Sequence, residues 1–416
     1  MIFNLLALLI TQIQDIKFDD YFVDKTMRVD MYITGNHIEE VITLDEIIVE
    51  DIWAGSKTNL IDYTGYGCEQ VRIYHTKSSR MIYSRGFCTL FGEWQTTDEA
   101  KVMKRTFHNT VRFPYPKDEV ELVIGVGQKK LFSMKIDPLK VRAKKLNPSR
   151  HENIKLHYSG ECSKNLDIII LPEGYTKTEE KKMIKDAERY TGILLSSEPY
   201  SYFKNKINIW LVKLFSNESG VSEPRKGIYK DTALNLTFNT FEIERYLTAP
   251  DNKRVRNAAA HTCYDTILIM VNTNRYGGAG IFNQWAIFPS DNEYDDYVFL
   301  HELGHSFAGL ADEYYTSKVA YSDFYPKGLE PWEPNITAYL KRDEIKWGNL
   351  IKKGIPIPTP EKEEYKNQVG LFEGAGYAAK DLYRPMMDCK MFSKGSSPFC
   401  VVCKASIEKM IKFYSE

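Results

Sequence analysis

One stretch of the sequence, HELGHSFAGLADEYY at residues 301–315, carries the strongest structural and chemical signal. It holds the pattern HExxH, in which His301 and His305 stand four residues apart. On a helix, positions i and i+4 share one face, so both imidazoles can reach one zinc ion. Glu302 lies next to them, where its carboxylate can take a proton from water at the metal. The apolar residues around the motif predict a buried helix, and the alternative is a purely structural histidine pair.

A catalytic zinc site needs a third protein ligand and one open position. Asp312 stands three residues after Gly309, which repeats the glycine-x-x-ligand spacing of the metzincin pattern with aspartate in place of histidine. No histidine follows His305, and the other six lie far upstream. We therefore expect Asp312 as the third ligand and Glu313 as the alternative. The one that does not bind metal is expected to orient an imidazole ring.

Seven further segments, together with this stretch, resemble the M64 peptidases, the IgA-peptidase family of zinc metalloendopeptidases. The resemblance covers nearly the whole chain in order, and its signature is specific. It implies a metzincin-like catalytic domain that hydrolyses protein or peptide substrates, glycoproteins among them, with one catalytic zinc. It does not imply that immunoglobulin A is the substrate. The segments are SRGFCTLFGEWQTT (84–97), LDIIILPEGYT (166–176), FSNESGV (215–221), YGGAGIFNQWAIFP (276–289), VGLFEGAGY (369–377), RPMMDCKMF (384–392) and PFCVVC (398–403).

The same resemblance implies further parts of an active site. Metzincins place a methionine turn beneath the zinc, and Met386 or Met387 in RPMMD is expected to fill that role. The glycine-rich stretch 277–282 is expected either as an edge strand that pairs with substrate backbone or as a flexible loop. A tyrosine could stabilise the negative charge that develops on the substrate carbonyl. The candidates are Tyr314, Tyr315 and Tyr383.

Composition fits a globular protein of two domains. The chain has 416 residues, of which 43% are hydrophobic and 27% charged. A formal charge of −1 argues against a nucleic-acid-binding protein, which would show a basic excess. Two rival functions remain: a non-catalytic protein that binds glycoproteins or cell surfaces on a peptidase scaffold, and a zinc amidohydrolase that acts on cell-wall peptide.

The pattern of apolar residues changes near residue 145 and predicts an α+β multidomain chain. Residues 17–140 read as an accessory β-sandwich, residues 141–153 as a linker, and residues 154–416 as an α/β zincin catalytic domain. The strands expected in the sandwich lie at Thr26–Thr34, Val41–Ile52, Val71–Tyr74, Val111–Tyr115, Val120–Val126 and Leu131–Ile136.

In the second domain, continuous apolar runs predict buried strands and helical spacing predicts helices between them. Thr176 and Glu179 form a capping box at the start of one helix. Asp291 and Asn292 are expected to cap the helix that carries His301. The strands are Leu166–Leu171, Ile207–Phe215 and Thr266–Val271, and the last helix spans Cys400–Tyr414.

The amino terminus and the cysteines bear on the compartment. The apolar run Ile2–Ile10 predicts an export signal within residues 1–16, with a first β-strand as the alternative. No other segment is apolar enough to cross a membrane. An exported protein in the periplasm, at the cell surface or secreted is expected, and there Cys68 and Cys88 can form a disulfide.

Three further cysteines cluster near the carboxy terminus. The pair Cys400-x-x-Cys403 is weak as a redox or zinc motif, because no second such pair accompanies it. A disulfide from Cys389 to one of the two is expected, with buried thiols as the alternative.

Overall fold

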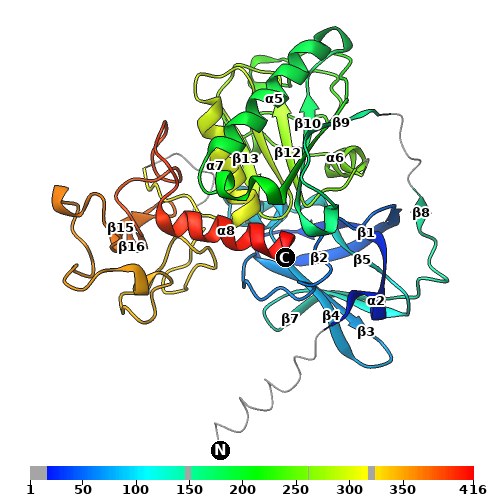
Figure 1. Cartoon of the computed structure of the whole chain (residues 1–416), viewed down its shortest axis with the longest axis horizontal. Coiled ribbons are helices and arrows are strands. Elements are labelled where there is room, and N and C mark those ends of the chain that lie inside the picture. The colour runs from blue at the N-terminus through cyan, green and yellow to red at the C-terminus, as the bar shows by residue number, and fades with distance from the viewer. Residues whose placement is uncertain (1–15, 146–150, 261, 317–323) are drawn as a thin grey trace, which may run out of the picture.

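The computed structural model describes residues 16–145, 151–260, 262–316 and 324–416. It is a mixed α+β molecule, in which the β-sheets of the N-terminal part are followed by a mixed α/β region (Figure 1). The predicted export signal at Ile2–Ile10 lies outside the described residues. Among the described residues, no helix is long and apolar enough to cross a membrane.

The N-terminal part contains two four-stranded sheets that share one hydrophobic core. All six predicted strands are present, whereas alternation does not reveal β4 because that strand is mostly buried on both faces. Neighbouring strands run antiparallel, except that β8 is parallel to β2. The first sheet has the order β5 (Arg105–Pro116), β1 (Phe22–Gly35), β2 (Glu40–Glu50) and β8 (Lys144–Lys145). The second sheet has the order β4 (Arg80–Phe87), β3 (Glu69–His75), β6 (Val120–Val126) and β7 (Lys129–Ile136). This part of the chain also contains the short helices α2 (Phe18–Tyr21), α3 (Leu90–Gln95) and α4 (Asp98–Val102).

The second region is built on one six-stranded sheet. Its central strands are parallel and fully buried, as expected for a sheet with helices on both faces, and its two edge strands are antiparallel. Helices α5 (Glu180–Ser196) and α7 (Asp295–Ala308) lie on one side of it and α6 (Asn252–Ala259) on the other (Figure 1). The strand order is β13 (Ala279–Ile281), β14 (Trp285–Pro289), β12 (Thr266–Val271), β10 (Leu166–Glu173), β11 (Ile207–Val212) and β9 (Asn153–His157).

Of the two helix starts that the sequence predicts, the structure confirms one and places the other later in the chain. The capping box is confirmed, since the Thr176 amide donates to Glu179 Oε2 at 2.9 Å. The helix of His301 begins later than predicted, at Asp295, so Asp291 and Asn292 are not its caps. Asn292 Oδ1 instead accepts the amide of Tyr294 in a turn ahead of the helix. Acidic residues of the first helical turn, which include Asp295, complement the helix dipole there.

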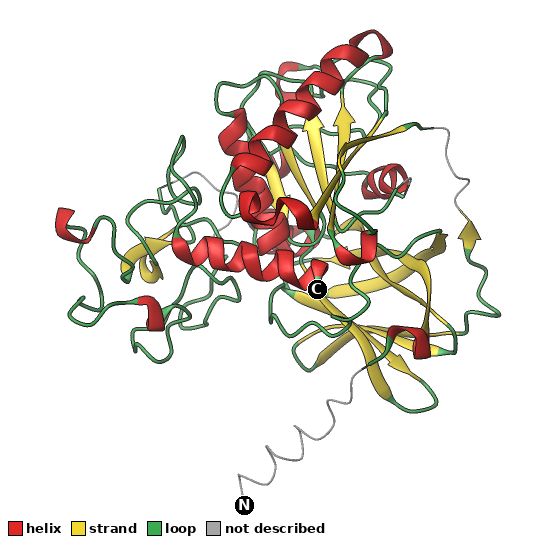
Figure 2. Ribbon diagram, in the orientation of Figure 1, coloured by secondary structure: helices red, strands yellow, loops and turns green. Residues whose placement is uncertain are grey.

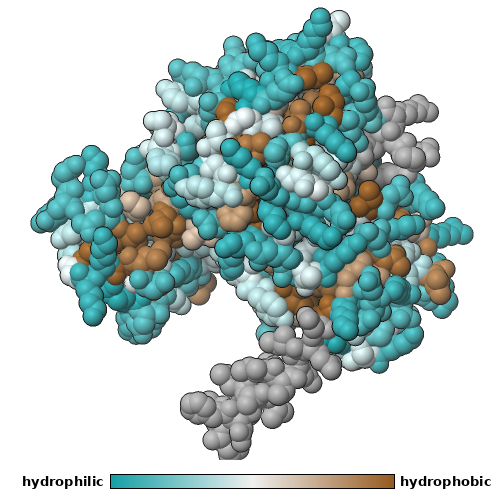
Figure 3. Space-filling view, in the orientation of Figure 1, coloured by the Kyte–Doolittle hydropathy of each residue, from teal (hydrophilic) through white to brown (hydrophobic). Residues whose placement is uncertain are grey.

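The last part of the chain is mostly loops around one hairpin, formed by β15 (Phe372–Ala375) and β16 (Ala378–Arg384) (Figure 2). Apolar side chains show at the surface over this segment (Figure 3). Helix α8 (Val401–Ser415) then packs against α7, close to the predicted bounds. Short 3-10 helices lie at Cys162–Lys164, Lys177–Glu179, Tyr200–Lys206, Pro224–Lys226, Thr240–Glu242, Gly348–Leu350 and Glu363–Tyr365.

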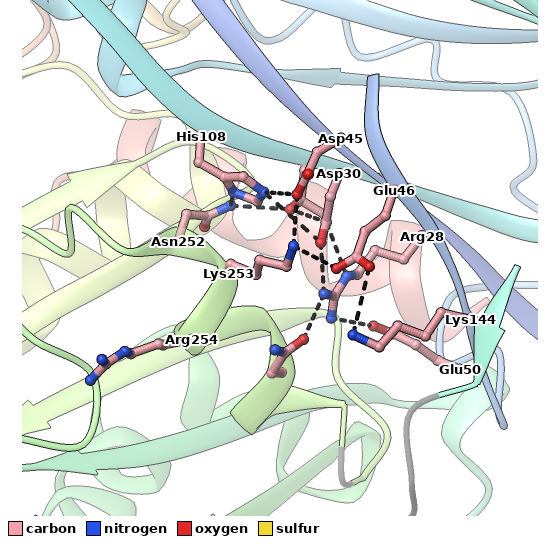
Figure 4. A network of polar contacts seen from close by, with 12 residues as sticks. Arg28, Asp30, Asp45, Glu46, Glu50, His108, Lys144, Asn252, Lys253 and Arg254 are labelled. Carbon is pink, nitrogen blue, oxygen red and sulfur yellow. Dashed lines mark hydrogen bonds and ion pairs between the residues drawn. The ribbon is translucent and has the colours of Figure 1, made fainter. Parts of the chain in front are cut away.

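A network of charged side chains joins the N-terminal sheets to helix α6 (Figure 4). Arg28 is fully buried on β1, where it pairs with Asp30 at 2.7 Å and donates to Asn257 Oδ1 at 2.7 Å. Lys253 on α6 pairs with Asp45 at 2.8 Å. The contacts of Arg28 with Asn257 and of Lys253 with Asp45 link residues more than two hundred positions apart, so they hold the two parts of the chain together.

The predicted disulfide between Cys68 and Cys88 is confirmed, and a second one joins Cys162 to Cys263. The predicted disulfide from Cys389 is wrong. Cys389, Cys400 and Cys403 are buried free thiols, and the sulfurs of Cys389 and Cys403 lie 3.7 Å apart.

Candidate active site

Two histidines and one aspartate converge at the base of a cleft. Helix α7 presents His301 and His305 on one face, with their Nε2 atoms 3.1 Å apart. Asp312 Oδ1 lies 3.0 Å from Nε2 of His301 and 3.3 Å from Nε2 of His305. The structure thus brings together the three residues that the sequence predicts as metal ligands.

The end of α7 explains how Asp312 reaches the histidines. Gly309 ends the helix in the left-handed conformation, with φ at 62°, which glycine adopts without strain. A Cβ at this position would lie 2.7 Å from Trp332, so close packing also requires glycine. The amide of Leu310 then bonds to the carbonyl of Gly304 at 3.1 Å, and the chain turns back beneath the helix.

Hydrogen bonds orient both imidazole rings. His301 Nδ1 lies 3.1 Å from the carbonyl oxygen of Lys390, and His305 Nδ1 lies 2.5 Å from that of Leu310. A carbonyl partner fixes the proton on Nδ1 and leaves Nε2 free to bind a metal. The hydroxyl of Tyr377 donates to Asp312 Oδ2, while Oδ1 has no hydrogen-bond donor among the described residues.

This donor set fits a zinc ion. With zinc-to-nitrogen distances of about 2.0–2.1 Å, tetrahedral ligands lie about 3.3 Å from one another, close to the separations found here. The charges agree with a cation site. Burial lowers the pKa of His305, but the carboxylate of Asp312 outweighs burial and raises the pKa to about 9. Burial opposes ionisation of Asp312, yet the two histidines hold its pKa well below the usual range. A metal cation can take the place of the protons that such a cluster attracts.

Glu302 stands beside this cluster in the wall of the cleft. Burial raises the pKa of its carboxyl, and the nearby positive charges of His301 and His305 partly offset that effect. A raised pKa brings a carboxylate closer to neutrality, where it exchanges protons with substrate more effectively.

The cleft has a volume of about 1070 Å³, and both parts of the chain line it. The N-terminal part contributes Glu69 and Thr89, and the catalytic region contributes strand β13 and the ligand cluster. Strand β13, which lies within the glycine-rich stretch 277–282, is at the edge of the six-stranded sheet. At Gly280 a Cβ would lie 2.4 Å from the carbonyl oxygen of Glu302, so this edge approaches α7 closely.

The structure separates the three candidate tyrosines. Tyr314 lines the cleft, and its ring is stacked with that of His301 at 6.4 Å between centroids. Tyr315 packs against Phe392, with a centroid distance of 6.2 Å. Tyr383 lies on β16, where its backbone pairs with Thr337. Only Tyr314 of the three lines the cleft.

Met391, which follows the expected turn, packs against the histidine helix. It is fully buried, and its sulfur lies 3.0 Å from the position that a Cβ on Gly304 would take. Met386 packs at the margin of the core, and Met387 is half-buried.

Glu313, the alternative ligand, does not join the histidines. Its Oε1 accepts a hydrogen bond from Asn335 at 3.0 Å and lies 3.2 Å from the sulfur of Cys403. Asp312 and Glu313 are adjacent in sequence, yet the carboxylate of Asp312 lies beside the histidines and that of Glu313 lies beside the sulfur of Cys403.

Sequence reasoning missed two polar residues of the site. Tyr377, which bonds to Asp312, lies in the segment VGLFEGAGY but has no motif that marks its role. Arg245 lines the cleft from a loop. Burial lowers the pKa of its guanidinium, but the Tyr314 and Tyr276 hydroxyls outweigh burial and raise it. No periodicity or spacing in the sequence places Arg245 at the site.

Two histidines, an aspartate and a neighbouring glutamate at the base of a two-walled cleft define a metal-dependent hydrolase. Residues 154–366 and 361–411 match the family model IgA Peptidase M64, and residues 17–134 match the model Peptidase M64 N-terminus. The chain therefore belongs to the M64 family of metallopeptidases, and its substrates are proteins. A comparison with curated proteins found no match.

Proposed function

We propose that the chain is a zinc-dependent endopeptidase in which His301, His305 and Asp312 hold the metal and Glu302 is the general base. The single observation that carries this proposal is the convergence of two Nε2 atoms and one carboxylate oxygen within 3.0–3.3 Å, beside Glu302. Zinc held there supplies Lewis acidity, which activates water and polarises the scissile carbonyl.

The residues of the chain perform the proton transfers. Glu302 accepts the proton of the attacking water and then delivers it to the leaving amine. Of the three candidate tyrosines, only Tyr314 lines the same cleft, and we assign to it the hydrogen bond to the carbonyl oxygen as negative charge develops. We assign to Met391, rather than to Met386 or Met387, the position beneath the histidine helix that metzincins fill with methionine.

Cleavage within a chain, rather than at its end, is supported by the cleft. Its volume of about 1070 Å³ slightly exceeds the roughly 300–1,000 Å³ of pockets that hold a drug-sized ligand. The backbone of β13 forms one edge, where an extended substrate can add as a further strand. The substrate therefore runs between the N-terminal β-sheets and the catalytic region.

We assign residues 17–140 to an accessory β-sandwich and residues 154–416 to a metzincin-like catalytic domain, with residues 1–16 as an export signal. The two disulfides of the described residues support a working place in an oxidising compartment. The periplasm, the cell surface and the extracellular medium are such compartments.

The test compares Glu302→Gln and His301→Ala with Glu188→Gln, which changes an exposed glutamate on α5. Cleavage of a peptide library is measured with and without a chelator, and metal content is measured alongside. Glu302→Gln should keep its metal and lose about 10²–10⁴-fold in turnover, whereas His301→Ala should lose metal and the control should change neither. Undiminished turnover in Glu302→Gln would mean that another group is the general base.

The same assay separates the rival functions. A binding protein on a peptidase scaffold would carry metal and cleave no peptide. A cell-wall amidohydrolase would leave the library intact and release fragments from cell-wall peptide.

A further inference from the structure

A second cluster of metal-ligating side chains lies behind the candidate active site. Glu313, Cys389, Cys400 and Cys403 each place one ligand atom within 4.8 Å of the others. Glu313, Cys389 and Cys403 are 0% exposed and Cys400 is 5% exposed. Four such donors, gathered from three separate stretches of the chain, form a closed set with no open position.

The separations within the cluster match tetrahedral zinc. Zinc-to-sulfur distances of about 2.3 Å place two thiolate ligands about 3.8 Å apart, and a carboxylate oxygen about 3.5 Å from a sulfur. The sulfurs of Cys389 and Cys403 are 3.7 Å apart, and Glu313 Oε1 lies 3.2 Å from the sulfur of Cys403. Since a disulfide bond measures about 2.05 Å, these thiols are spaced for a shared ligand instead of a covalent bond.

One polar atom of the cluster is buried without a hydrogen-bond partner. Glu313 Oε2 makes no hydrogen bond among the described residues. Buried polar atoms are ordinarily satisfied, and an unsatisfied one calls for a partner such as a bound ion. A cation held by this carboxylate and the three sulfurs would be such a partner.

The backbone is arranged to support thiolates. Cys400 is the N-cap of α8, and Cys403 lies in its first turn, where the helix dipole favours negative charge. The amide of Cys400 donates to the sulfur of Cys389 at 3.2 Å, and the amide of Cys403 donates to the sulfur of Cys400 at 3.5 Å.

We propose that Glu313, Cys389, Cys400 and Cys403 bind a structural zinc ion, distinct from the catalytic metal. Thiolate donors select zinc over magnesium or calcium, and binding releases the three thiol protons to solvent. The proposal goes beyond the proposed peptidase function and does not depend on it.

The position of this ion gives it a role. Glu313 directly follows Asp312, and Cys389 directly precedes Lys390, whose carbonyl lies 3.1 Å from Nδ1 of His301. A zinc ion that ties Glu313 to Cys389 therefore fixes both a catalytic ligand and the group that orients another.

The test is a metal count on the purified full chain, without reductant. The wild type should hold two zinc ions per chain, the double variant His301→Ala/His305→Ala should hold one, and Cys400→Ser/Cys403→Ser should also hold one. The control Cys162→Ser/Cys263→Ser removes two cysteines outside the cluster and should keep two. No zinc in the double histidine variant, or a zinc content that Cys400→Ser/Cys403→Ser leaves at the wild-type level, overturns the proposal.

Two further measurements do not depend on whether the cysteine variant folds. The double histidine variant, reloaded with cobalt, should show thiolate-to-cobalt charge-transfer absorption, and its absence overturns the proposal. Alkylation of the denatured wild-type chain with chelator present should label three cysteines. A single labelled cysteine would mean that two of the three cluster cysteines are joined by a disulfide in the native protein, which also overturns it.

Discussion

Replacing Gly280 with alanine should damage both stability and catalysis, because strand β13 lies against the helix that carries the proposed catalytic residues. The added Cβ would lie 2.4 Å from the carbonyl oxygen of Glu302 and 2.8 Å from Cβ of His305. Ordinary contact begins at 3.4 Å, so β13 and α7 must separate by about 1 Å, an overpacking that costs about 1–3 kcal/mol. A displacement of about 1 Å at a catalytic group costs on the order of 10²-fold in rate.

The assay pairs kcat/KM on a cleaved peptide with urea unfolding of the same preparation. Gly192→Ala is the matched control, since nothing lies within 4 Å of a Cβ added at that position in α5. Alanine in a helix should leave the control's activity unchanged and stabilise it by up to about 1 kcal/mol. Wild-type kcat/KM and an unchanged unfolding midpoint in Gly280→Ala would refute the close approach of β13 to α7.

Three other variants, one of them with a control, test separate parts of the structure. Burial raises the pKa of the Glu69 carboxyl to about 8, above the value of about 4.5 expected in the unfolded chain. The protonated carboxyl therefore contributes its full stability below pH 4.5, and this contribution is lost as the pH rises through 8. Glu69→Gln should flatten that decline in urea midpoints measured against pH. Arg28→Met should lower the free energy of unfolding in urea by about 3–5 kcal/mol, because it leaves buried carboxylates without their positive partner. The control Lys57→Met removes an exposed ion pair and should lower the free energy of unfolding by only about 0–1 kcal/mol. Tyr377→Phe should weaken metal affinity by about 10–100-fold in chelator competition, because it removes the hydrogen bond to Asp312; unchanged affinity would contradict that role.

The local sequence predicts the candidate site wherever the chain itself sets the spacing. The histidines share a helix face, and the turn at Gly309 brings Asp312 to them, so four residues follow from one short stretch. Most strands are equally local in origin, because alternation or a continuous apolar run identifies each one.

What the sequence does not predict depends on contacts between distant segments. Glu313 has the right chemistry for the catalytic metal, yet the cluster of thiols from α8 and the loop before it surrounds its carboxylate instead. Met391 is only four residues from Met387, and the path of that loop decides which of them reaches α7. The disulfide between Cys162 and Cys263 joins residues 101 positions apart, and no local sequence pattern predicts it.

The two-walled cleft couples substrate binding to the association of the two parts of the chain. A ligand that touches both walls makes all its contacts only when the N-terminal sheets and the catalytic region are associated. Its binding free energy therefore stabilises the associated state. At a concentration of 100 times Kd, such a ligand contributes about 2.7 kcal/mol. In calorimetry, an inhibitor that touches both walls should therefore raise the melting temperature of the N-terminal sheets, although they hold none of the proposed metal-binding residues.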